Sequence, residues 1–214
     1  EVDDVDDLSA RAQGVVVGHV LERDKHPNAD KLSVCSVDVG AQEPIQIVCG
    51  ASNVRAGIHV PVAMVGATLP AVGLTIKAGE LRGVASNGMI CSLTELGLTE
   101  QSDGIAILDE LQATLPATGA PVAPLLGLDD TVLELAITAN RPDGLSMVGI
   151  AREVAALTGG SLSLPQLDLD PSTTPLTTDM DGCFYSITRI EGVDGSKQSP
   201  TWLQQRLERG GVNS

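Results

Sequence analysis

The chain has 214 residues, 43% of them hydrophobic and 19% charged, which is the composition of an ordered globular protein with at least one full core. Its formal net charge of -15 excludes indiscriminate binding to nucleic acid, because such a surface repels phosphates. Any contact with RNA must therefore use a local basic or neutral patch. No secretory leader pattern opens the sequence and no apolar run approaches membrane length, so we expect a cytoplasmic protein.

Cysteine usage argues against a metal site and against a disulfide framework. The four cysteines are scattered, none forms a C-x-x-C pair, and no histidines lie at ligand spacing. We therefore expect no zinc site and interpret the cysteines as buried thiols of a reducing compartment. They are Cys35, Cys49, Cys91 and Cys183.

Short strands and turns dominate the first half of the chain. The acidic opening, residues 1–14, predicts an exposed strand or connector, and the β-branched run at 15–21 predicts the first buried strand. Turn residues follow at 26–30. The stretch 31–39 changes its apolar parity at Ser36, which predicts a bulge or a strand buried on both faces.

The same pattern continues to about residue 108. In order, we expect strands at 45–49 and 60–64, short strands around a turn at 74–77 and 79–82, a turn at 86–88, a helical turn at 92–98 and a last strand at 105–108. No helical apolar period is sustained here. Short strands at close spacing with glycine-rich turns therefore indicate a small closed barrel.

Helices are expected only in the second half. A proline-bearing connector at 116–124 precedes a strand at 131–138. An apolar stripe at 145–157 then predicts a helix that Asp143 caps and Gly159 ends. Beyond it we expect a further strand at 185–190 and a helix at 200–209 with Trp202 facing inward.

Three segments carry a family resemblance. They read His-Pro-Asn-Ala-Asp-Lys-Leu at 26–32, Val-Cys-Gly-Ala-Ser-Asn at 48–53 and Leu-Arg-Gly-Val-Ala-Ser-Asn-Gly-Met-Ile-Cys-Ser at 81–92. In this order and spacing they resemble the tRNA-binding OB domain that several synthetases share with stand-alone tRNA-binding proteins. The resemblance covers roughly residues 15–110, and the three segments together are specific where each alone would be weak.

A fourth segment selects a branch within that superfamily. Thr-Ala-Asn-Arg-Pro-Asp-Gly-Leu-Ser at 138–146 and Gly-Ile-Ala-Arg-Glu at 149–153 look like the stretch after the barrel in bacterial phenylalanyl-tRNA synthetase β subunits. The resemblance implies a mainly β fold with α+β parts, in which an OB-fold barrel is inserted into a small α/β domain. Its parts would be a truncated α/β domain at 1–14 and 126–163, the barrel at 15–125, a linker at 164–181 and the start of an editing-type domain at 182–214.

This resemblance also implies a function. The chain would be the tRNA-binding and scaffold portion of the ligase that attaches phenylalanine to its tRNA with ATP. Because the family places amino-acid activation on the α subunit, no catalytic residue, metal or cofactor is expected in this fragment. ATP and magnesium would serve the intact enzyme, whose partners would be phenylalanine-specific tRNA and the α subunit, with no membrane and no DNA.

Two turns carry the first candidates for RNA contact. Lys31 follows a turn made rigid by Pro27, so its cation can meet a tRNA phosphate, although it could also be a solvated lysine. Asn28 and Asn53 follow apolar strands. Their amides can read a base edge or a 2′-hydroxyl, or they can cap their own turns.

The loop 86–89 supplies further candidates, and by resemblance it belongs to the tRNA-facing side. Ser86 could donate to a phosphate, Asn87 lies in the tight turn, and Met89 could lie against a base or ribose. The alternative is that Met89 is core and the loop only closes the barrel. Lys77 and Arg82 extend the patch or are simply exposed charges.

Two observations predict weak, salt-sensitive RNA binding. OB folds usually stack bases on aromatic side chains, yet the aromatic residues lie outside 15–110. Within that range six basic residues stand against eleven acidic ones, a balance of five negative charges. In the fourth segment Asn140, Arg141 and Asp143 are predicted to be structural, with Arg141 paired to an acidic partner.

Three rival interpretations remain open. The chain could be a stand-alone homodimeric tRNA-binding module, although segment 138–153 has no role in one. It could be a protein-assembly OB module without an RNA role. An independent deacylase would require catalytic residues that we do not find: no nucleophile signature accompanies the histidines, and no phosphate-binding glycine loop is present.

Overall fold

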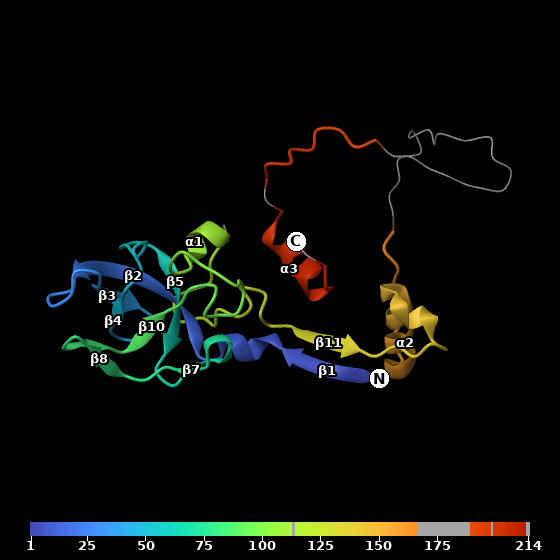
Figure 1. Ribbon diagram of the computed structural model, residues 1–214, viewed down its shortest axis with the longest axis horizontal. Helices are drawn as coiled ribbons and strands as arrows, with labels where there is room; N and C mark the ends of the chain where they lie inside the picture. Colours follow the sequence, from blue (N-terminus) through green and yellow to red (C-terminus); the bar gives the residue numbers. More distant parts are fainter. Residues whose placement is uncertain (113, 167–188, 198, 213–214) are drawn as a thin grey trace. The chain divides into compact units, whose positions relative to one another are not determined.

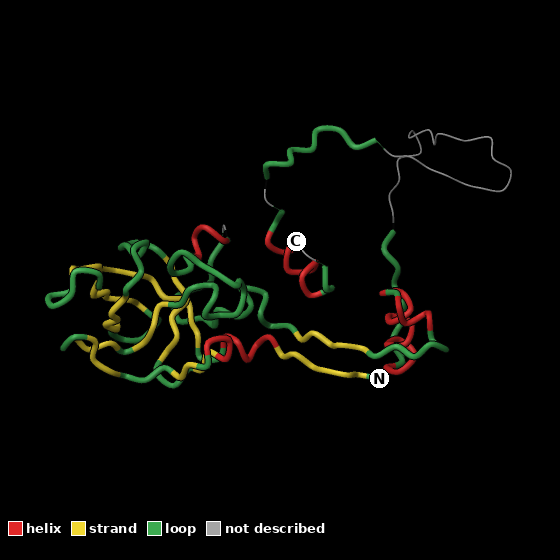
Figure 2. The backbone as a smooth tube through the Cα atoms, in the orientation of Figure 1, coloured by secondary structure: helices red, strands yellow, loops and turns green. Residues whose placement is uncertain are grey.

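The computed structural model describes residues 1–112, 114–166, 189–197 and 199–212, and its regular structure is mainly β, as predicted (Figures 1 and 2). Contacts divide it into two compact units, Glu1–Asp3 with Leu135–Pro200 and Asp4–Glu134 with Thr201–Ser214. Each is described separately. The strand predicted at 185–190 lies mostly outside the described residues, as does the linker from residue 167.

A five-stranded antiparallel barrel forms the larger unit, in the order β10-β5-β2-β3-β4 (Figure 1). Its strands are β2 (Val15–Lys25), β3 (Ser33–Asp38), β4 (Ile45–Cys49), β5 (His59–Met64) and β10 (Gly88–Ile90). Strands β4 and β10 do not pair as a continuous ladder. Individual hydrogen bonds join the two edges instead, such as the one that the N–H of Asn87 donates to the carbonyl of Gln46 at 2.9 Å. The barrel is therefore nearly closed, which confirms the fold class.

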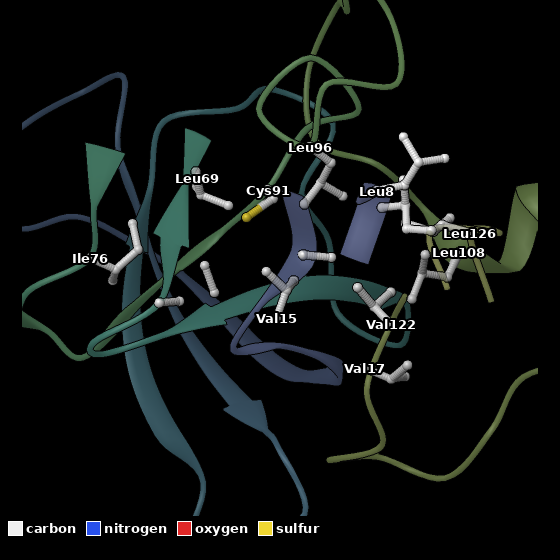
Figure 3. Packing of buried hydrophobic residues seen from close by; sticks show 14 residues of the cluster. Leu8, Val15, Val17, Leu69, Ile76, Cys91, Leu96, Leu108, Val122 and Leu126 are labelled. Carbon is white, nitrogen blue, oxygen red and sulfur yellow. The ribbon is translucent and has the colours of Figure 1, made fainter. Parts of the chain in front are cut away.

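Strand β2 is buried on both faces, and this places two hydrophobic clusters back to back. Val16 and Val20 face the barrel interior, which also contains Val37 and Val62. Val15 and the other residues of the opposite face pack into a second cluster (Figure 3), formed with Leu8, Leu69, Leu96, Leu108, Val122 and Leu126. The continuous apolar run at 15–20 reflects this double burial.

Several smaller elements lie outside the barrel sheet. They are β1 (Val2–Asp7), which pairs with β11 (Thr131–Leu135); the β6–β7 pair (Thr68–Leu69, Leu74–Thr75); the β8–β9 hairpin (Gly79–Leu81, Val84–Ser86); α1 (Leu108–Leu111); α3 (Thr201–Arg209); and the 3-10 turns Leu8–Ala12 and Pro70–Val72. No described helix has the length and apolar character needed to cross a membrane.

Several local predictions for the larger unit were wrong. The bulge lies in β2, where the register shifts between Val20 and Glu22, while β3 alternates regularly through Ser36. Segments 74–77 and 79–82 pair with β6 and β9 rather than with each other. Residues 105–107 form no strand, and α1 begins at Leu108. Trp202 of α3 is 65% exposed. The strand differences depend on pairing with segments elsewhere in the chain, which the local pattern does not show.

The smaller unit contains α2 (Met147–Thr158), which Gly159 ends in the left-handed conformation, as predicted. The N-cap is Ser146, not Asp143, because the hydroxyl of Ser146 accepts a hydrogen bond from the N–H of Gly149 at 3.0 Å. Asp143 lies in the preceding 3-10 turn (Pro142–Leu145) and its carboxylate binds Arg141.

Candidate nucleic-acid interface

The turn after β2 is joined to the β8–β9 hairpin through a buried histidine. His26 is 2% exposed, and its Nδ1 accepts a hydrogen bond from the N–H of Asn28 at 3.1 Å. Its Nε2 therefore carries the proton and donates to the carbonyl of Leu81 at 3.0 Å. The Nδ2 of Asn28 donates to the carbonyl of Arg82 at 2.9 Å. Two turns that lie about fifty residues apart in sequence are thereby fixed side by side.

The hairpin turn itself is tight. Arg82 and Gly83 both have positive φ, 52° and 83°, as the two-residue turn of a β-hairpin requires. A non-glycine residue in this conformation carries strain, and the bond from Asn28 to the Arg82 carbonyl compensates for it. The guanidinium of Arg82 is thus presented on a rigid, exposed tip.

Lys31, Lys77 and Arg82 are the three cations that we predicted to contact a phosphate. All three are exposed, and none forms an ion pair within the described part of the chain. Arg55, by contrast, is paired with Glu110 at 3.2 Å. Unpaired cations can attract an RNA phosphate without first breaking an internal contact.

The three predicted contact residues at the loop between β9 and β10 differ in how exposed they are. Ser86 is buried, and its hydroxyl accepts from the N–H of Val48 and donates to the carbonyl of Gly88, both at 3.1 Å. Donation from Ser86 to a phosphate would require its bond to Gly88 to break. Asn87 is exposed, whereas Met89 is half-buried.

The side-chain amide of Asn53 hydrogen-bonds both backbone groups of Ile105, as a neighbouring strand would. Its Nδ2 donates to the carbonyl of Ile105 at 2.9 Å, and its Oδ1 accepts from the Ile105 N–H at 3.1 Å. Gly104 leaves the space for this amide, since a Cβ there would lie 2.3 Å from Oδ1. Contact of this amide with a base would compete with both bonds.

Replacing Asn53 with alanine is expected to lower the free energy of unfolding by about 1–3 kcal/mol, because Ile105 loses partners for both backbone groups. Urea unfolding measures the change. The matched control is Asn87→Ala, an exposed asparagine whose substitution should stay within about 0.5 kcal/mol of the parent. Equal stabilities for the two variants would contradict this role of Asn53.

In the smaller unit Arg141 links two acidic residues. It contacts Asp143 at 2.9 Å and Glu153 at 2.7 Å, and these hydrogen bonds raise the pKa of the Arg141 guanidinium. The same contact lowers the pKa of Asp143. Asn140 is exposed next to them. The apolar surface at α2 also remains open: Leu145 of the preceding 3-10 turn and Met147 and Leu157 of the helix are each about four-fifths exposed.

The cysteines among the described residues are not reactive nucleophiles. Cys35, Cys49 and Cys91 are buried free thiols, as predicted, while Cys183 lies outside the described residues. Burial raises the pKa of Cys35 to about 11 and that of Cys91 to about 12, and it also raises the pKa of Cys49. These thiols stay protonated near neutral pH and are poor nucleophiles. No cluster of metal-binding side chains occurs within the described ranges.

His26 and Glu95 were not predicted from the sequence as residues of the candidate site. The contacts of His26 with Leu81 cross 55 residues, so no local pattern shows them. Glu95 had a local signal, because Ser92 and Glu95 have the spacing of a capping box. Each side chain accepts a hydrogen bond from the other residue's N–H, at 2.6 and 3.2 Å.

A nearly closed five-stranded barrel whose exposed turns carry unpaired cations is the architecture of a nucleic-acid-binding OB domain. Consistently, the family model described as "Putative tRNA binding domain" matches residues 15–115. The chain therefore contains a domain of the tRNA-binding class.

Similar proteins of known name identify a family within this class. The chain is 92% identical over all 214 residues to the phenylalanine–tRNA ligase β subunit of Synechococcus sp. strain CC9605, of which it covers 26%. It is 71% identical to that of Parasynechococcus marenigrum strain WH8102 and 56% identical to that of Synechocystis sp. strain PCC 6803, covering 27% and 26% of them. The chain belongs to the phenylalanine–tRNA ligase β-subunit family and spans about a quarter of the length of these relatives.

Proposed function

We propose that the chain is the tRNA-binding and scaffold portion of a phenylalanine–tRNA ligase β subunit, and that its barrel contacts phenylalanine-specific tRNA. The observation that carries the proposal is the pair of joined turns, in which Asn28 binds the carbonyl of Arg82 beside the buried His26. This arrangement holds the exposed side chains of Arg82 and Lys31 on fixed backbone. The match to the tRNA-binding family supports RNA as the ligand.

The intact enzyme would attach phenylalanine to tRNA with ATP and magnesium, together with an α subunit, in the cytoplasm. We assign none of these chemical steps to this fragment, and neither a membrane nor DNA is among the partners we propose. The scaffold role is supported by the exposed apolar face of α2, which includes Met147 and Leu157. An apolar face of this kind is typical of a surface that another polypeptide covers.

Binding by the chain should be weak and strongly dependent on salt. The six basic and eleven acidic residues of 15–110 repel phosphate on average, so attraction depends on a few cations. The contacts we propose come from Lys31, Lys77 and Arg82, with Asn28, Asn53, Ser86, Asn87 and Met89 as neighbouring polar or shape contacts. Without barrel aromatics, stacking adds little.

Substituting Lys31 or Arg82 with alanine should weaken tRNA binding several-fold, and each should reduce the slope of log K against log salt by about 1. Filter binding over a salt series measures both quantities. Arg55→Ala is the matched control, because it removes the same charge from a residue engaged with Glu110. If Arg55→Ala has the same effect, or if binding is tight and insensitive to salt, the proposed surface is wrong.

A further inference from the structure

A hollow of about 370 Å³ opens beside the proposed tRNA surface, between the loops after β4, after β10 and at residues 102–105. Its volume falls near the lower end of the range for small-ligand sites, roughly 300–1,000 Å³. The half-buried Met89 contributes an apolar, polarizable wall that suits the face of a flat ring. Gly50 and Gly104 leave the rim without side chains.

The polar groups of the hollow have a defined donor and acceptor pattern. Glu95 uses Oε2 to accept from the N–H of Ser92, and no described residue donates to its Oε1. The hydroxyls of Ser92 and Ser102 both accept hydrogen bonds, from the N–H of Glu95 and from the hydroxyl of Thr94. Each serine can therefore donate its own proton to a ligand. The hollow offers one anionic acceptor beside two donors.

We propose that this hollow binds one unstacked cytosine base of RNA, an inference that rests on the proposed tRNA-binding function. The exocyclic N4 amine of cytosine donates to Oε1 of Glu95, as carboxylates do when they read this base. Its N3 and O2 atoms accept from Ser92 and Ser102, and its ring lies against Met89. A phosphate is excluded, because the carboxylate would repel it.

Uracil provides the discriminating comparison. It has the size of cytosine but carries a carbonyl oxygen in place of the amine, so it would place an acceptor against the carboxylate of Glu95. One good polar contact to a base edge corresponds to discrimination of about tenfold. The chain should therefore bind cytosine-containing single strands about tenfold more tightly than matched uracil-containing strands.

Glu95→Gln tests the proposal without removing the local fold. Glutamine can keep an amide oxygen toward the N–H of Ser92, and it is an accepted partner in this capping arrangement. Its NH₂ group then replaces the free oxygen, so the acceptor becomes a donor. This variant should lose the preference for cytosine and favour uracil instead.

The measurement is fluorescence anisotropy of labelled oligo-C and oligo-U hexaribonucleotides, and of tRNA, titrated with the 214-residue chain. Glu100→Gln, which removes the same charge from an exposed position, should leave the ratio unchanged. Equal affinity of the parent for both hexamers, or an unchanged ratio in Glu95→Gln while tRNA still binds, overturns the cytosine site alone. If the parent binds neither the hexamers nor tRNA, the proposed function fails as well.

Discussion

Replacing Gly18 with alanine should lower the free energy of unfolding by about 1–3 kcal/mol, although it adds a single methyl group. Gly18 is buried in β2, and a Cβ there would lie 2.5 Å from Cγ2 of Val62 and 2.9 Å from Cγ1 of Val37. Both valines belong to the barrel interior. Because β-branched side chains have restricted rotamers, the added methyl has to displace strands rather than a flexible chain end.

Urea unfolding of Gly18→Ala measures this cost, with Gly79→Ala as the control. Gly79 begins the exposed strand β8, and a Cβ built on it meets no atom within 4 Å. That substitution should leave stability unchanged or raise it by about 0.4–1 kcal/mol through the unfolded state. A loss of the same size in both variants would mean that backbone conformation, not packing inside the barrel, explains the effect.

Strands with a clear local period could be predicted from the sequence. Strand β4 was predicted from the alternation of Ile45, Ile47 and Cys49, and β5 from the similar spacing of Val60, Val62 and Met64. These residues pack into or against the barrel interior, although β5 is also buried on its other face through Ala63. The prediction for β2 ended at residue 21, whereas the strand continues to Lys25. Pairing with β3 keeps this polar end extended, as in the register of Arg23 with Cys35.

Features that depend on distant partners could not be predicted. The segment 105–107 has strand composition, yet it is fixed by the side chain of Asn53 rather than by a ladder. The alternative roles of Asn53 could not be separated, since only the position of Ile105 reveals what its amide contacts. Similarly, the hydroxyl of Ser86 is directed into the barrel by Val48, a contact across 38 residues. The motif residues could thus be recognised, but their orientations could not.

The second large effect is expected for His26→Ala, which should lower the free energy of unfolding by about 2–4 kcal/mol. Removing the imidazole leaves the N–H of Asn28 and the carbonyl of Leu81 without their partner and opens a cavity where the ring is 2% exposed. Denaturant unfolding measures the loss. The comparison variant, Asn28→Ala, removes only the exposed bond to the Arg82 carbonyl and should cost less than about 1 kcal/mol.

Binding data on the same two variants separate positioning from direct contact. The His26 ring is buried, so RNA cannot touch it, and a weaker tRNA affinity of folded His26→Ala would have to come from displacement of the turns that carry Lys31 and Arg82. The titrations are made at low temperature, under conditions in which circular dichroism shows that this variant is folded. Rescue by His26→Gln, whose amide can donate and accept, would favour positioning. Unchanged stability in His26→Ala would show that the two turns do not depend on the buried ring.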